Sequence, residues 1–175
     1  YDKDVFKVIL VQFVSLKRGG EKISMSTRSG EFETLSNVIK EVGVDATRFF
    51  FLMRSSDSHL DFDLELAKKE SSENPVFYIQ YAHARICSIF RTAAEQGLNL
   101  LAPADIDMSL LNDDEELSII KKILAFTEVV EKSAQSLEVH RIAFYLQDLV
   151  SSFHMLIPYV LATIVFLVIM LLVAL

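Results

Sequence analysis

The sequence has few of the residues that form disulfide bonds and metal sites. Its single cysteine, Cys87, excludes an internal disulfide bond and a zinc site built from several cysteines. None of the four histidines stands at close ligand spacing from another, so we expect no metal site. No charged-then-apolar stretch typical of a secretory leader opens the sequence. It begins with Tyr1 in place of methionine, from which we expect a piece of a longer protein.

Positive charge is also scarce. The net charge is −7, which by itself argues against an RNA partner. Residues 1–60 hold nine Lys/Arg and eight Asp/Glu, a net of +1, whereas residues 61–154 hold eight and sixteen, a net of −8. Nucleic-acid binding depends on a local basic surface more than on this sum. Composition therefore gives no support of its own to a nucleic-acid partner.

An apolar run and a polar loop open the chain. Residues 5–16 are rich in β-branched and aromatic side chains, which predicts a buried, parallel strand. We expect its neighbouring strands to lie outside this chain. The loop Gly20–Gly30 follows, with cations at Lys22 and Arg28 and no acid between them. Such a loop can hold an anion with backbone N–H groups and side-chain charge, but an ordinary polar turn has the same composition.

Short helices are predicted next. Thr34 is placed to cap a helix that ends at Gly43 in the left-handed conformation, and Asp45 is placed to cap a second. The polar residues 55–59 predict a hydrogen-bonded turn. Asp63 is placed to cap a further helix over residues 64–69.

Longer helices are predicted after Asn74-Pro75, which is a strong helix start. The first should end at Gly97, followed by a connector to Asn112. Asn112 should cap a helix that continues to Thr127, because four acids follow it. A last amphipathic helix is expected over residues 138–154. Together, residues 75–154 predict an antiparallel helical bundle.

Three blocks of this sequence resemble one family. The loop Gly20–Gly30, the stretch Glu41–Asp63 and the stretch Asn74–Arg85 follow one another as they do in bacterial arginyl-tRNA synthetases. The loop is similar to the second signature motif of class I aminoacyl-tRNA synthetases. The resemblance covers about Tyr1 to His154 and is weaker, though recognisable, in His140–Leu146.

The resemblance implies a mainly α fold for a C-terminal fragment of such an enzyme. Residues 1–73 would be the end of a Rossmann-type α/β catalytic domain, with one strand, the signature loop and connecting helices. Residues 74–154 would be an incomplete anticodon-binding helical bundle. Residues 155–175 would be an apolar tail that is atypical of the family.

The resemblance also implies a reaction. The intact enzyme would use ATP, with Mg²⁺, to attach arginine to tRNA(Arg) through arginyl-adenylate, as a monomer in the cytoplasm. The family binds ATP with a His-x-Gly-His signature, and no such pattern occurs here. We therefore expect the fragment alone to bind no cofactor and to have no ligase activity.

The signature loop departs from the family pattern at two positions. The family typically has lysine before Met25, and often another after Ser26, where this chain has Ser24 and Thr27. Loss of a cation from a phosphate contact predicts weaker activation. The loop residues implied to act on the ATP phosphates are Lys22, Ser24, Met25, Ser26, Thr27 and Arg28.

A second group of residues is implied to bind tRNA. Tyrosines can stack on unpaired bases and arginines can contact the RNA backbone. Equally, the tyrosines could pack between helices and the arginines could pair with acids such as Asp45, Asp57 or Asp61. The group consists of Arg48, Arg54, Tyr78, Tyr81 and Arg85.

The last twenty-one residues, Met155–Leu175, differ in kind from the rest. They carry no charge, and as a helix they would span roughly 31 Å, enough for a bilayer core. They could be a membrane anchor, the product of a frameshift or chimeric gene end, or a buried apolar helix. Two other functions therefore stay open: a tail-anchored membrane protein, and a non-catalytic helical module that binds tRNA or protein.

Overall fold

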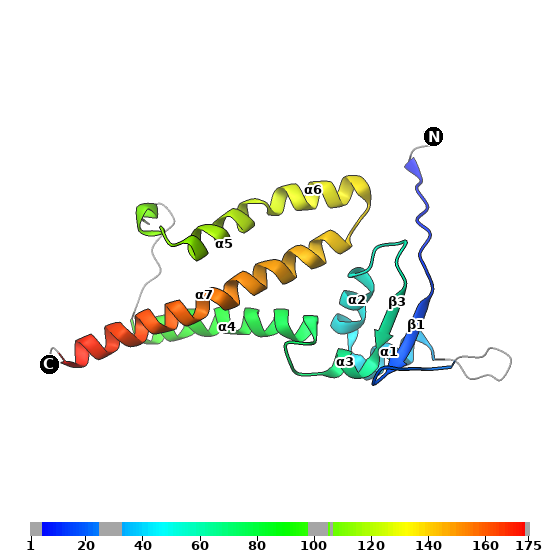
Figure 1. The fold of residues 1–175 in the computed structure, drawn as a ribbon, viewed down its shortest axis with the longest axis horizontal. Coiled ribbons are helices and arrows are strands. Elements are labelled where there is room, and N and C mark those ends of the chain that lie inside the picture. The colour runs from blue at the N-terminus through cyan, green and yellow to red at the C-terminus, as the bar shows by residue number, and fades with distance from the viewer. Residues whose placement is uncertain (1–4, 25–32, 98–104, 106, 174–175) are drawn as a thin grey trace. The chain divides into compact units, whose positions relative to one another are not determined.

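The computed structural model describes residues 5–24, 33–97, 105 and 107–173, but not the side chains of Met108 and residues 158–173. The chain divides into two compact units. Unit 1 comprises Tyr1–Tyr78 and Val129–Phe144, and unit 2 comprises Ile79–Glu128 and Tyr145–Leu175. Figure 1 shows the helices and strands along the chain.

Unit 1 contains a three-stranded sheet in the order β2-β1-β3. The central strand β1 (Val14–Arg18) is antiparallel to β2 (Glu21–Lys22) and parallel to β3 (Leu60–Asp63). Parallel pairing of the first strand was predicted from its apolar run, and this is confirmed. The expectation that no neighbouring strand belongs to this chain was wrong, because β3 lies beside β1 (Figure 1).

The bounds predicted for the first strand were also wrong. Residues 6–13 are not assigned to a strand, although the Gln12 N–H donates to the Ser56 carbonyl at 3.0 Å. Their side chains are exposed, with Phe6 at 81% and Phe13 at 89%. An apolar run predicts a strand only where a neighbour completes the ladder of hydrogen bonds, and β3 is only four residues long.

The core of unit 1 lies where the sheet meets three short helices. The side chain of Phe62 is fully buried, and the rings of Phe50 and Phe51 meet it edge-on at 5.2 and 5.8 Å between centroids. Such edge-to-face contacts are favourable beyond the area they bury. The buried core residues are Leu16, Val38, Ala46, Phe50, Leu60, Phe62, Leu64, Ala67 and Val76.

Helices α1 (Leu35–Val42) and α2 (Val44–Leu52) lie in this core region. The predicted cap at Thr34 is confirmed, because its hydroxyl accepts from the Asn37 N–H at 3.1 Å. Helix α1 does end at Gly43, and this glycine has a positive φ of 87°, but its ψ of 160° lies outside the left-handed helical region. Gly43 also begins α2, which places Asp45 inside the first turn. The prediction of Asp45 as the cap was wrong.

Helix α3 (Leu64–Lys68) follows β3 directly, and Asp63 caps it as predicted. Helix α4 (Pro75–Glu95) begins at the predicted Asn74-Pro75 start. Asn74 is buried, and its side-chain oxygen accepts from the Val76 N–H at 3.1 Å. Its side-chain amide donates to the carbonyls of Ala67, in the last turn of α3, and Lys69, which follows that helix. These bonds fix the start of α4.

The remaining helices are η3 (Met108–Leu110), α5 (Asp114–Leu124), α6 (Phe126–Ser136) and α7 (His140–Val173). Asp113 is the N-cap of α5 and its N–H donates to the Glu116 carboxylate at 3.3 Å, so the prediction of Asn112 as the cap was one residue early. The helix predicted to reach Thr127 is interrupted at Ala125, where α6 follows. The mainly α fold class is confirmed.

Helix α7 begins at His140, two residues later than predicted, and its backbone continues into the apolar tail as far as Val173. Within the part of the chain that the structure describes, no helix combines the length and apolar character needed to cross a membrane.

Candidate functional site

The base of the signature loop is a tight turn between β1 and β2. Gly19 and Gly20 both have positive φ, at 60° and 88°, a region that glycine adopts without the steric cost of a side chain. Lys22 and Ser24 follow and are exposed to solvent. The other predicted loop residues, Met25, Ser26, Thr27 and Arg28, lie outside the described residues.

Two lysines lie opposite each other at this base. In the β1–β2 pairing Lys17 lies opposite Lys22, and the Lys17 ammonium pairs with the Asp61 carboxylate at 2.8 Å. The hydrogen bond from Lys17 lowers the pKa of Asp61. Lys22 therefore has a second cation beside it that the sequence analysis missed. The sequence did contain a sign of this: a two-glycine turn at Gly19–Gly20 predicts a hairpin in which Lys17 lies opposite Lys22.

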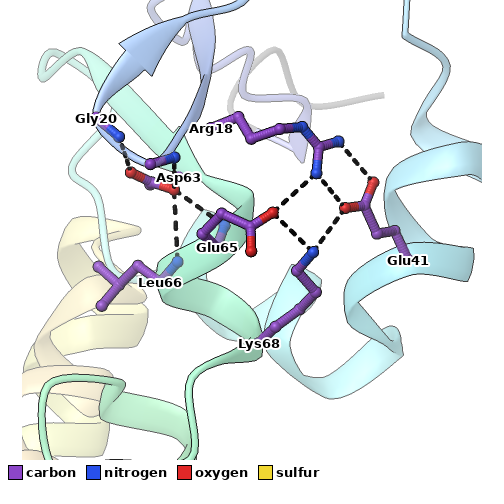
Figure 2. A network of polar contacts seen from close by, with 8 residues as sticks. Arg18, Gly20, Glu41, Asp63, Glu65, Leu66 and Lys68 are labelled. Carbon is purple, nitrogen blue, oxygen red and sulfur yellow. Dashed lines mark hydrogen bonds and ion pairs between the residues drawn. The ribbon is translucent and has the colours of Figure 1, made fainter.

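The carboxylate of Asp63 joins this turn to α3. One oxygen accepts from the Gly19 N–H at 3.1 Å and from the Glu65 N–H at 3.0 Å, and the other accepts from the Gly20 N–H at 2.7 Å (Figure 2). Burial alone would raise the pKa of Asp63, but the backbone donors outweigh it and the pKa is lowered. The sequence predicted the helix cap and gave no sign of the bonds to the glycines.

An ion cluster holds the residue before the turn. Arg18 donates to both Glu41 oxygens, at 2.7 and 3.0 Å, and to the Glu65 carboxylate at 2.9 Å. Lys68 donates to the same two carboxylates at 2.9 and 2.8 Å. Two cations and two anions thus alternate around a closed ring (Figure 2), which links β1, α1 and α3.

The ion cluster predicts a specific loss of stability in acid. The hydrogen bond from Arg18 lowers the pKa of Glu41 to about 2, from 4.5. Because the pKa is lower in the folded state, Glu41 stabilises the fold above about pH 4.5 and loses this effect as the pH falls towards 2. In Glu41→Gln, the free energy of unfolding, measured with urea at a series of pH values, should depend less steeply on pH in this window. Parallel curves for the two proteins would contradict the assignment.

The predicted arginines of unit 1 are both on its surface. Arg48 lies in α2, Arg54 follows that helix, and both side chains are exposed. Of the acids considered as their partners, Asp61 pairs with Lys17, and Asp57 has its pKa lowered by a hydrogen bond from Ser55. The turn predicted over residues 55–59 is confirmed by the Ser58 N–H, which donates to the Ser55 carbonyl at 3.1 Å.

Unit 2 brings aromatic and cationic groups together on α4. The Tyr81 ring is 45% exposed and stacks on the His154 ring, with centroids 5.7 Å apart and planes inclined by 16°. The Arg85 guanidinium lies 6.0 Å from the centre of the same tyrosine ring, within cation–π range. Tyr78, which belongs to unit 1, is half-buried. An exposed aromatic ring with a cation beside it is a surface on which an unpaired base can stack.

His154 was not among the predicted site residues. It lies on α7, far from Tyr81 in the sequence, so helical spacing could not have paired the two. Within the described residues, no group of three or more His, Cys, Asp and Glu side chains is placed to hold a metal ion.

Part of the chain matches a known domain family. Residues 79–157 match the DALR anticodon binding domain. Over 148 residues, or 85% of its length, the chain is 56% identical to an arginine–tRNA ligase of Syntrophotalea carbinolica, and over 147 residues it is 58% identical to one of Geobacter sp. strain M21. The chain belongs to the arginyl-tRNA synthetase family. It spans about a quarter of the length of these relatives, 27% and 26%.

Solved structures of the family share the fold. A Campylobacter jejuni protein described as an arginyl-tRNA synthetase superposes with a TM-score of 0.75 at 33% identity, over 91% of this chain and 34% of that one. The arginyl-tRNA synthetase of Thermus thermophilus gives a TM-score of 0.57 at 24% identity, over 79% of this chain and 25% of that one, which supports the fold alone. The family resemblance inferred from the three sequence blocks is thus confirmed.

Proposed function

We propose that this chain is the segment of an arginine–tRNA ligase that binds tRNA(Arg). The observation that carries the proposal is the exposed Tyr81 ring, stacked on His154 and flanked by Arg85, within the residues that match the anticodon-binding family. Stacking on an aromatic ring is a common way for proteins to hold unpaired bases, as in an anticodon loop. Arg48 and Arg54 would contact the tRNA backbone from unit 1, and Tyr78 would assist Tyr81.

The loop base gives the chain a second role in the intact enzyme. Lys22, with Lys17 beside it, would stabilise negative charge on the ATP phosphates as pyrophosphate leaves. Ser24, Met25, Ser26, Thr27 and Arg28 would continue this loop. ATP, Mg²⁺ and arginine would bind only when the rest of the catalytic domain is present, so the chain alone should catalyse no arginine-dependent pyrophosphate exchange.

The domain division follows from this proposal. Residues 1–73 would end the catalytic domain, residues 74–154 would form most of the anticodon-binding bundle, and residues 155–175 would be an atypical tail. The intact enzyme would act as a monomer in the cytoplasm. A non-catalytic module would also bind tRNA, but it would show no pyrophosphate exchange when joined to a catalytic half.

Titration of labelled tRNA(Arg) with the chain, followed by fluorescence anisotropy, tests the proposal. We expect saturable binding that is tighter than binding to a tRNA of another amino acid. Affinity should fall as salt rises, because phosphate contacts release counterions. Equal affinity for both tRNAs would overturn the assignment to tRNA(Arg).

A further inference from the structure

Asp63 occupies a joint between the signature loop and the helix that follows β3. Its side chain is half-buried at the end of β3 and accepts from four backbone N–H groups. Two of these groups belong to the turn Gly19–Gly20 and two belong to the first turn of α3. A helix cap needs only the second pair. The bonds to the glycines therefore require a separate explanation.

Side-chain packing adds little restraint to the turn itself. With nothing within 4 Å of the place where a Cβ would stand on either glycine, no side chain packs against it there. Glycine has the widest choice of backbone conformations, so a two-glycine turn at positive φ is costly to fix in one conformation. A carboxylate that accepts from both amides fixes it, and these charge-assisted bonds are stronger than neutral ones.

The turn is also held on its strand side. Arg18, which directly precedes Gly19, is bound by Glu41 and Glu65. Hydrogen bonds with Asp63 and within the ion cluster thus fix three consecutive residues, 18–20, to elements that are distant in the sequence. Lys22 lies two residues after Gly20, at the end of β2 and near the start of the signature loop.

We propose that Asp63 is a positioning residue for the signature loop: by fixing the Gly19–Gly20 turn to α3, it sets the path of the chain into β2 and so the position of Lys22. This inference rests on the proposed function, in which the loop acts on the ATP phosphates. A phosphate-binding loop works only if its groups lie close to their productive positions, and a displacement of about 1 Å can cost about 100-fold in rate.

Asp63→Asn separates this role from the helix cap. Asparagine is as good an N-cap as aspartate, so its single side-chain oxygen can still cap α3. Its amide group is a donor, however, and cannot accept from the Gly20 N–H. Asp61→Asn is the matched control, because it removes the same charge from the same strand and breaks the ion pair with Lys17 without changing an acceptor of the glycine amides.

The first measurement is amide hydrogen exchange by NMR on the full 175-residue chain. In Asp63→Asn we expect exchange at Gly20 to be about tenfold faster or more, with Gly19, Glu65 and Leu66 unchanged, because the oxygen that caps α3 also accepts from Gly19. Asp61→Asn should leave all four as in the parent. In the parent, the Gly20 amide shift should also follow protonation of Asp63 as the pH is lowered, which needs no variant. Unchanged Gly20 exchange in Asp63→Asn, or a Gly20 shift that does not titrate, would overturn the inference.

The second measurement separates positioning from folding. A full-length ligase that carries this chain in place of the matching segment of the Syntrophotalea carbinolica relative is assayed for arginine-dependent pyrophosphate exchange. Asp63→Asn should lower kcat about 10- to 100-fold while the Kd for tRNA(Arg) stays within about twofold. If the parent ligase is active and Asp63→Asn keeps its kcat, the inference alone fails. If the parent ligase shows no exchange, the proposed function fails, and the inference fails with it.

Discussion

Replacement of Phe62 by alanine is expected to lower the free energy of unfolding of unit 1 by about 3–5 kcal/mol. Phe62 is fully buried, and its ring contacts those of Phe50 and Phe51. Alanine would leave a cavity between β3 and α2, because the backbone on both sides is held by hydrogen bonds and relaxes only in part. Since small domains are stable by only about 5–15 kcal/mol, a loss of this size removes a large share of the total.

Urea unfolding followed by far-UV circular dichroism measures this change. Phe13→Ala is the matched control, since it removes the same ring from a side chain that is 89% exposed. It should change the free energy of unfolding by no more than about 0.5 kcal/mol. A loss below about 1 kcal/mol for Phe62→Ala would mean that this ring is not at the centre of the core.

Replacement of Tyr81 by alanine is expected to weaken binding of tRNA(Arg) about 10- to 100-fold. Stacking of one base on an aromatic side chain is worth about 1–3 kcal/mol. Tyr81 is the exposed member of its cluster, and both neighbours help to hold its ring: His154 stacks on it and Arg85 lies over it. The Kd from anisotropy titrations at fixed salt measures the effect.

Two variants control for folding and for general charge. Tyr81→Phe keeps the ring and should bind tRNA(Arg) within about threefold of the parent, because stacking needs the ring and not the hydroxyl. Phe90→Ala removes an aromatic ring that is 51% exposed on the same helix, nine residues on and therefore about half a rotation away. It should leave the Kd unchanged. An equal loss in Phe90→Ala and Tyr81→Ala would show that neither ring forms a specific base contact.

Local signals in the sequence predicted local structure well. Thr34 and Asp63 cap their helices as predicted because a cap depends on a side chain and the amides two or three residues later. The errors at Asp45 and Asn112 have the same origin. In both places another residue nearby occupies the N-cap position, namely Gly43 and Asp113.

Contacts between distant segments could not be predicted in this way. Strand β3 is four residues long, and only its pairing with β1 distinguishes it from a polar turn. The second role of Asp63 depends on Gly19 and Gly20, which lie more than forty residues away in the sequence. The stacking of His154 on Tyr81 is equally non-local. The family resemblance pointed to the loop and to Tyr81, whereas their partners, Asp63 and His154, could be identified only from the structure.

The most direct test of the central claim compares two RNAs in the same titration. One is tRNA(Arg), and the other is the same tRNA with its anticodon loop replaced by an unrelated loop of equal length. If the Tyr81 face of the chain reads the anticodon loop, the replacement should weaken binding about tenfold or more, since loss of a stacked base costs about 1–3 kcal/mol. Equal Kd values for the two RNAs would contradict an anticodon-binding function for this chain.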